Sequence, residues 1–209
     1  MPTTPEPNAT PDRDEIVARI NLMETMIAEG RQATCQFGWI FVLWGLVDLS
    51  GMALQWERPN HWWNWPLAIG LGLVLQYAGF GLRRRSRGVC RPNTQSRAIS
   101  AIWGMMGATL ILFCFTAIFT HQSWGAGYLA AIFMTIGLAH TASGIILRWG
   151  VQFAVGAIFW AGGLACFFVN NERWFLYIFG LEMLFGMILF GIYAMILERR
   201  TPPPMMLAQ

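Results

Sequence analysis

The sequence contains little charge and no lysine. Charged residues make up 12% of its 209 residues, against about 25% in a typical soluble domain. All fourteen basic residues are arginine, which excludes chemistry that requires a lysine, such as Schiff-base formation or phosphate binding by a P-loop. Because 56% of the residues are hydrophobic, a water-soluble fold of this length could not bury the apolar surface. We therefore expect a membrane protein.

Cysteine is also scarce, and its spacing matches no known kind of site. Cys35, Cys90, Cys114 and Cys166 form no CxxC pair, which argues against a disulfide framework and against a zinc site. We expect four free thiols, no metal and no cofactor. The N-terminus lacks a basic segment followed by an apolar stretch, so we expect no cleavable signal peptide.

Six long apolar runs account for most of the chain. Each is close to the roughly 20 residues that cross a bilayer as a helix, whereas barrel strands would alternate and be about 10 residues long. The sequence therefore predicts an all-α membrane protein with six transmembrane helices. The predicted spans are residues 36–56, 63–82, 99–120, 124–147, 149–170 and 174–197.

Short motifs recur in alternate spans, which favours an arrangement as three helical hairpins. Spans one, three and five contain Leu-Trp-Gly, Ile-Trp-Gly and Phe-Trp-Ala-Gly, and the return spans contain Ile-Gly-Leu or Phe-Gly-Leu. Common descent and coincidence both explain this pattern. The predicted organisation is a cytoplasmic N-terminal region (1–35), a membrane domain (36–198) and a cytoplasmic tail (199–209).

The arginines are concentrated on one side of the predicted bundle. The loop at 83–97 carries no acidic residue, and only Arg58 and Arg173 fall on the opposite side of the membrane. Because loops rich in arginine stay in the cytoplasm, both termini are predicted to be cytoplasmic. The arginines of the loop are Arg83, Arg84, Arg85, Arg87, Arg91 and Arg97.

This arginine loop has several interpretations. It can act as the topology determinant, bind anionic lipid, pair with the acidic face of the N-terminal helix, or recruit an acidic partner. Nucleic-acid binding is not expected, because the loop carries no aromatic side chain on which a base could stack.

An amphipathic helix is predicted before the first span. Thr10 is a good N-cap, and Ile16, Ile20, Met23 and Ile27 follow at a spacing that places them on one face. This apolar stripe could lie on the membrane, pair with a copy of itself, or dock onto the protein's own cytoplasmic face. Helices that bind anionic bilayers are usually basic, and this one is net acidic, so docking is favoured.

Four polar residues within the spans are the candidate site. Asp48 and Glu182 each lie eight residues from the outer end of a span, about 12 Å below the interface. The two carboxylates could share a proton or hold a cation, or each could stabilise helix packing separately. We interpret His140 as a side chain that forms a hydrogen bond between helices. Gln76 lies at a roughly similar depth in the membrane.

Part of the N-terminal region resembles a group of known sequences. Residues 26–31 (Met-Ile-Ala-Glu-Gly-Arg) lead into residues 39–45 (Trp-Ile-Phe-Val-Leu-Trp-Gly). This stretch resembles the opening of uncharacterised bacterial multi-pass inner-membrane proteins, in which an amphipathic helix precedes a first span containing Leu-Trp-Gly. The resemblance implies a bacterial inner membrane and assigns no activity or functional residue.

The absence of catalytic motifs completes the functional prediction. The sequence contains no HExxH, no GxSxG and no serine–histidine–aspartate set, so an enzyme is not expected. We expect a non-catalytic accessory, sensory or scaffold subunit that self-associates or binds another membrane protein. The alternative is a small proton- or cation-coupled transporter that uses the intramembrane carboxylates.

Overall fold

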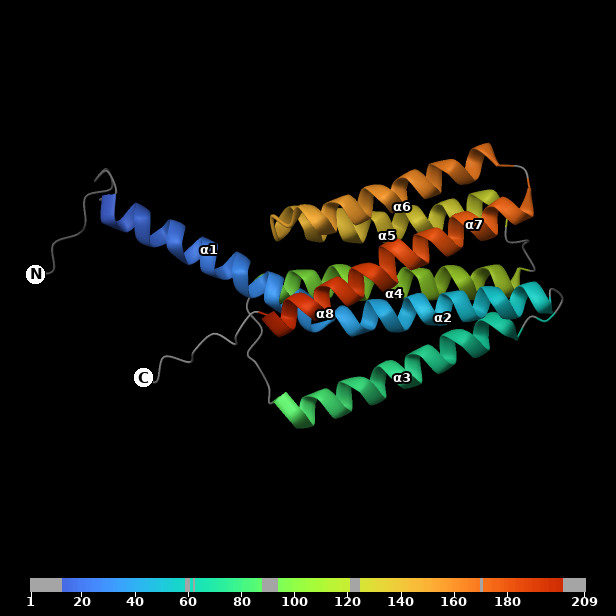
Figure 1. Cartoon of the computed structure of the whole chain (residues 1–209), viewed down its shortest axis with the longest axis horizontal. Helices are drawn as coiled ribbons and strands as arrows, with labels where there is room; N and C mark the ends of the chain where they lie inside the picture. Colours follow the sequence, from blue (N-terminus) through green and yellow to red (C-terminus); the bar gives the residue numbers. More distant parts are fainter. Residues whose placement is uncertain are drawn as a thin grey trace, which may run out of the picture.

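The computed structural model describes residues 13–58, 61, 63–87, 94–120, 125–169 and 171–200. The described residues are almost entirely helical (Figure 1). The predicted start of the first helix at Thr10 lies outside them. The elements are α1 (Arg13–Gln36), α2 (Gly38–Glu57), α3 (Asn64–Arg87), α4 (Thr94–Phe119), α5 (Ala126–Ile146), α6 (Gly150–Phe168), α7 (Glu172–Glu182), a π-helical segment (Met183–Leu189) and α8 (Phe190–Arg200).

The predicted all-α membrane fold is confirmed. Within the described residues, six helices are long and apolar enough to cross a bilayer. They are Gly38–Glu57, Asn64–Arg83, Arg97–Ala117, Ala126–Ile146, Gly150–Phe168 and Arg173–Arg200. The sixth is continuous through α7, the π-helical segment and α8. All six lie within a few residues of the predicted spans. Long apolar runs predict them because a chain inside the bilayer must make its backbone hydrogen bonds within its own helix.

The closest packing in the bundle joins α5 to α6. Small residues permit it, since a Cβ added at Gly156 would overlap the Thr141 side chain, and one at Gly144 would lie 2.6 Å from the backbone nitrogen of Phe153. Without a hydrophobic drive between helices in lipid, such close approach supplies the packing energy. The turn between the two helices contains Arg148, whose φ of 48° lies in the left-handed region.

Other helix contacts agree only in part with three hairpins. α2 packs on α3, α4 on α5, and α6 on α7. The α5–α6 contact is more extensive than any of these and joins two helices that the prediction assigned to different hairpins. Descent from a repeated hairpin stays a prediction.

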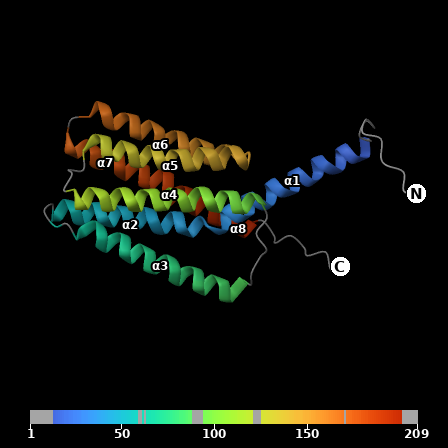
Figure 2. The same cartoon turned by 180° about the vertical axis from the view of Figure 1, so that it is seen from behind.

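Aromatic and large aliphatic side chains form the core between α2, α5, α6 and the last span. Phe133, Phe159, Phe179, Met183 and Phe190 are all buried there. α3 lies at one edge of the bundle and α6 at the other (Figure 2). α3 packs mainly on α2, and α4 packs on α1 and α5, while no extensive contact joins α3 to α4 among the described residues.

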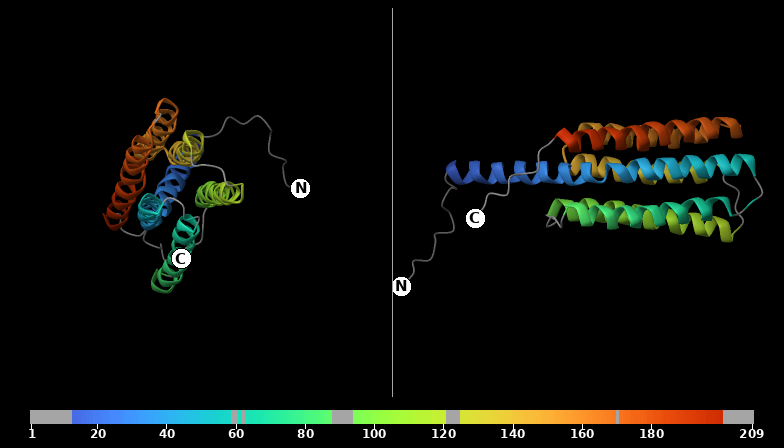
Figure 3. Two further views of the ribbon diagram at one scale, coloured as in Figure 1. Left: turned by 90° about the vertical axis from the view of Figure 1, so that its right-hand side faces the viewer. Right: turned by 60° about the horizontal axis from the view of Figure 1, so that its bottom comes forward.

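Helix α1 projects beyond the ends of the other helices (Figures 1 and 3). Only its last turns pack against the bundle, on α4 and α8. Ile16, Ile20 and Met23 of the apolar stripe are exposed, and Ile27 is half-buried. Docking of the stripe onto the protein's own bundle, which the charge had favoured, is therefore not seen, because α1 continues directly into α2 instead of folding back.

Candidate functional site

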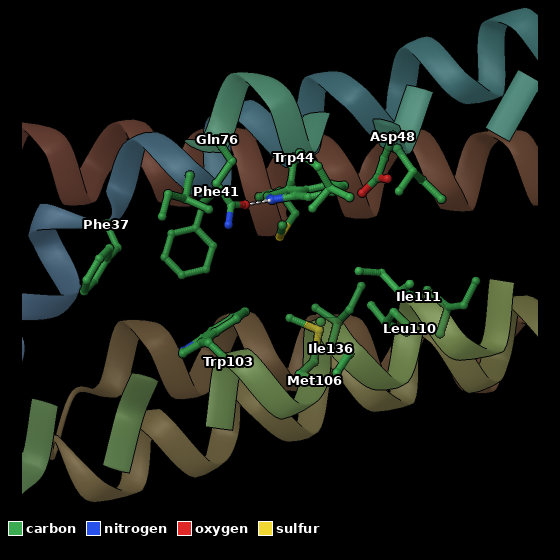
Figure 4. Close-up of a pocket in the computed structure, with 18 of the residues that line it drawn as sticks. Phe37, Phe41, Trp44, Asp48, Gln76, Trp103, Met106, Leu110, Ile111 and Ile136 are labelled. Atoms are coloured by element: carbon green, nitrogen blue, oxygen red, sulfur yellow. Dashed lines mark hydrogen bonds between the residues drawn. The ribbon is translucent and has the colours of Figure 1, made fainter. Parts of the chain in front are cut away.

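A cavity of about 670 Å³ lies between α2, α3 and α4 (Figure 4). Ile132 and Ile136 of α5, and Phe179 and Met183 of the last span, close its inner side. The cavity forms beside α3 and α4, which pack on different neighbours in the described part of the chain.

Glycine on α4 enlarges this space. Gly104 and Gly107 line the cavity, and a Cβ added at either would meet no atom within 4 Å. The α4 wall therefore has room for a ligand or for a larger side chain without any rearrangement of the protein.

The cavity wall is largely aromatic. The Phe41 and Trp103 rings face each other edge-on across α2 and α4, with centroids 4.7 Å apart. Phe37 and Phe80 make a similar contact at 6.2 Å between α2 and α3. Such rings offer both apolar surface and an electron-rich face. The aromatic residues lining the cavity are Phe37, Phe41, Trp44, Tyr77, Phe80, Trp103 and Phe179.

Two of the predicted site residues, Asp48 and Gln76, lie on this wall. The indole Nε1 of Trp44 donates a hydrogen bond of 2.6 Å to Gln76 Oε1, which ties α2 to α3. Asp48 follows Trp44 by one turn of α2, and its carboxylate is directed into the cavity (Figure 4). Asp48 is the only charged residue among those that line the cavity.

Glu182 lies elsewhere in the bundle. It is 5% exposed, stands immediately before the π-helical segment, and is not among the residues that line the cavity. A Cβ at Gly162 of α6 would overlap its carboxyl group. The structure thus assigns Asp48 to the cavity and Glu182 to the interface with α6, and a site shared by the two carboxylates stays a prediction.

His140 is enclosed by aromatic rings and is fully buried. Its ring centroid lies 4.8 Å from Trp103, 5.1 Å from Phe190, 5.5 Å from Phe41 and 5.6 Å from Phe159. Neither imidazole nitrogen has a hydrogen-bond partner in the described part of the chain. The predicted interhelical hydrogen bond is therefore absent there, and four aromatic rings pack around the imidazole instead.

Two further buried polar residues were not predicted as candidates. Ser143 of α5 and Gln152 of α6 are fully buried, and their side-chain polar atoms have no hydrogen-bond partner among the residues described. Gln152 lies inside a predicted span, so its polarity is the same sequence signal that singled out Gln76.

The arginine loop is described only at its edges. Arg83 lies over the Trp39 ring, 5.2 Å from its centroid, and its Nη1 is 4.0 Å from Glu198 Oε2 of α8. Glu198 of the last span is thus an acidic partner of Arg83, and a pairing of the loop with the N-terminal helix stays a prediction. Arg97 is exposed at the start of α4. Arg91 and the side chains of Arg84, Arg85 and Arg87 lie outside the described residues.

The cysteines of the described residues are free thiols. Cys114, on the cavity wall, and the buried Cys166 are free; Cys90 and the Cys35 side chain lie outside the described residues. No group of three or more His, Cys, Asp or Glu residues suited to a metal ion occurs in the described ranges.

Comparisons of the chain with protein-family models, curated proteins and solved structures found no match. The resemblance stated above stays a prediction.

Proposed function

We propose that this integral membrane protein is a non-catalytic sensory or accessory subunit that binds a small membrane-dissolved molecule in the cavity between α2, α3 and α4. The observation that carries the proposal is the cavity itself. Its volume of about 670 Å³ falls within the roughly 300–1,000 Å³ of small-molecule sites. Its wall has the composition of such sites, mostly apolar and aromatic with a few polar groups.

The position of the cavity supports entry from the bilayer. Two of its three walls, α3 and α4, are membrane-spanning helices without extensive contact to each other among the described residues. The gap between them is the entry route that we propose. A molecule dissolved in the hydrocarbon would reach the cavity through it without crossing the protein's core.

The groups on the wall favour binding over catalysis. Asp48, Ser100, Gln76 and Cys114 are polar or reactive, but the wall carries no histidine that could act as a base beside the serine or cysteine. Nucleophilic catalysis needs such a pair within hydrogen-bonding reach. We therefore propose that the protein is not an enzyme.

The arginine distribution supports the proposed location. With Arg58 and Arg173 on one side and the remaining arginines on the other, the positive-inside rule places both termini in the cytoplasm. We propose a bacterial inner membrane. The accessory role implies association with a second copy of the chain or with another membrane protein. We also propose that anionic lipid binds at the arginine loop.

Filling the cavity tests the binding role. Gly107→Leu places an apolar side chain in the cavity, whereas Gly81→Leu places the same side chain at an exposed position of α3 outside it. Both replace a helical glycine, so any gain in helix propensity is shared. Native mass spectrometry of protein extracted in mild detergent should show a bound small molecule in the wild type and in Gly81→Leu but not in Gly107→Leu. Equal occupancy in all three proteins, or none in the wild type, would contradict the proposal.

A carrier that uses Asp48 is the second candidate. Asp48 faces the cavity, and intramembrane acids serve as proton or cation sites in transporters. A carrier would move its ligand across a liposome membrane in proportion to a proton gradient and would stop when Asp48 is replaced by Asn. A binding protein would retain the ligand without transport.

A further inference from the structure

We infer that the cavity selects a lipophilic cation, an amine or quaternary ammonium group attached to an apolar body. The inference rests on the binding role proposed above and specifies the ligand. It combines a single carboxylate, the Trp44 ring one turn away from it, and the absence of a basic side chain among the described residues of the wall.

The charge on the described part of the wall is negative. Among the described residues, Asp48 is the only acidic residue that lines the cavity, and no arginine or histidine is found there. No ion pair of Asp48 is formed within the described ranges. An ionised carboxylate at this depth requires a counter-charge, and a cationic ligand would supply it.

One aromatic ring of the wall lies close to the same charge. Trp44 is one turn from Asp48 on α2, whereas Trp103 and Phe41 lie further along the cavity, where they would contact the apolar body. A quaternary ammonium or protonated amine is attracted to the faces of such rings, most strongly to Trp. A neutral ligand of the same shape would gain only the apolar contact.

The orientation of the polar groups disfavours an anionic ligand. The Trp44 indole already donates its hydrogen to Gln76, so it is engaged before any ligand binds. Arg83, near the cytoplasmic end of α3, lies over Trp39 and close to Glu198. An anionic headgroup would therefore meet the Asp48 carboxylate without a free basic partner on the wall.

The cavity is also elongated along α2. Phe37 and Asp48 both line it and are eleven residues apart, which corresponds to about 16 Å along a helix. A ligand with its charged group at Asp48 would place an alkyl or aryl body toward Phe37. The expected ligand is thus an amphiphile with one cationic end.

Binding of a matched pair of ligands tests the inference. Radiolabelled dodecyltrimethylammonium and its neutral isostere, in which carbon replaces the nitrogen, are compared on the full chain in lipid nanodiscs, with empty nanodiscs subtracted. We expect the cation to bind the wild type about tenfold or more tightly than the isostere. Asp48→Asn should lose most of this preference and keep only the smaller part that the Trp44 ring supplies.

Glu182→Gln is the matched control, because it also neutralises an intramembrane carboxylate but lies outside the cavity. It should retain the preference for the cation. If Asp48→Asn does not fold, two measurements still test the inference. These are the comparison of the two ligands on the wild type and their comparison on Asp48→Glu, which should keep the preference for the cation. Equal binding of the two ligands to the wild type, or a preference unchanged in Asp48→Asn, overturns the inference and leaves the binding role intact. If neither ligand binds above empty nanodiscs, the binding role fails as well.

Discussion

The indole of Trp44 and the amide of Gln76 are joined by a hydrogen bond of 2.6 Å that links α2 to α3. Both residues line the cavity, and Asp48 follows one turn later on α2. Across the cavity from these three residues lie the α4 side chains Trp103 and Met106 (Figure 4). The carboxylate and the amide of the wall thus both come from the α2–α3 side.

Breaking this hydrogen bond should weaken the attachment of α3. Gln76→Leu leaves the Trp44 N–H without its acceptor, and Trp44→Phe removes the donor. Hydrogen bonds between membrane helices contribute about 0.6 kcal/mol on average and about 1.7 kcal/mol at most. A double-mutant cycle on the unfolding free energy in detergent should return a coupling within that range. Additive effects of the two substitutions would show that the bond contributes nothing.

Replacing Gly186 of the π-helical segment with alanine should destabilise the protein. A Cβ at Gly186 would overlap the ring of Phe159, whereas a Cβ at Gly180 on the same span would meet nothing within 4 Å. Overpacking of this kind costs about 1–3 kcal/mol. Gly186→Ala should lower the thermal midpoint in detergent, and Gly180→Ala should leave it unchanged or raise it. Equal midpoints for the two variants would mean that the ring of Phe159 does not occupy this space.

Replacing His140 with an apolar residue should not destabilise the protein. Its two ring nitrogens have no hydrogen-bond partner in the described part of the chain, and a buried polar group without a partner costs about 1–3 kcal/mol. His140→Leu should therefore leave the unfolding free energy unchanged or raise it. Phe159→Leu, which shrinks a fully buried ring beside it, serves as the destabilising reference. A loss in His140→Leu as large as that of the reference would reveal a polar partner of the imidazole.

The proposed topology has a direct test. Alkaline phosphatase, which is active only in the periplasm, should be inactive when fused after Gln209 and active when inserted next to Arg58 in the loop between α2 and α3. The reason is the concentration of arginines on the opposite side of the membrane. Activity at the C-terminus would reverse the orientation of every span.

The six spans could be predicted from the sequence because apolar length alone determines them. The span Asn64–Arg83 was expected at residues 63–82, and Ala126–Ile146 at 124–147. Gln76 and Asp48 could be selected as candidates because a polar side chain inside a span needs a reason to be there.

Features that depend on how helices meet could not be predicted. The cavity lies beside α3 and α4, which pack on different neighbours in the described part of the chain, and no local pattern encodes that choice. The pairing of Arg83 with Glu198 joins residues from distant parts of the chain. The sequence had indicated an acidic partner on the nearer N-terminal helix. The π-helical segment at Met183–Leu189 was not predicted, because the apolar pattern of the span is the same for an α-helix.

Two adjacent methionines on α4 supply the most direct measurement of cavity occupancy. Met106 lines the cavity, while Met105 is 68% exposed on the outer surface of the bundle. Photo-crosslinking with a diazirine-bearing alkylammonium in nanodiscs should label both residues, and peptide mass spectrometry separates them. Excess dodecyltrimethylammonium should abolish the label on Met106 and leave that on Met105 unchanged. Labelling confined to Met105, or labels on both residues that respond equally to the competitor, would contradict a binding site between α2, α3 and α4.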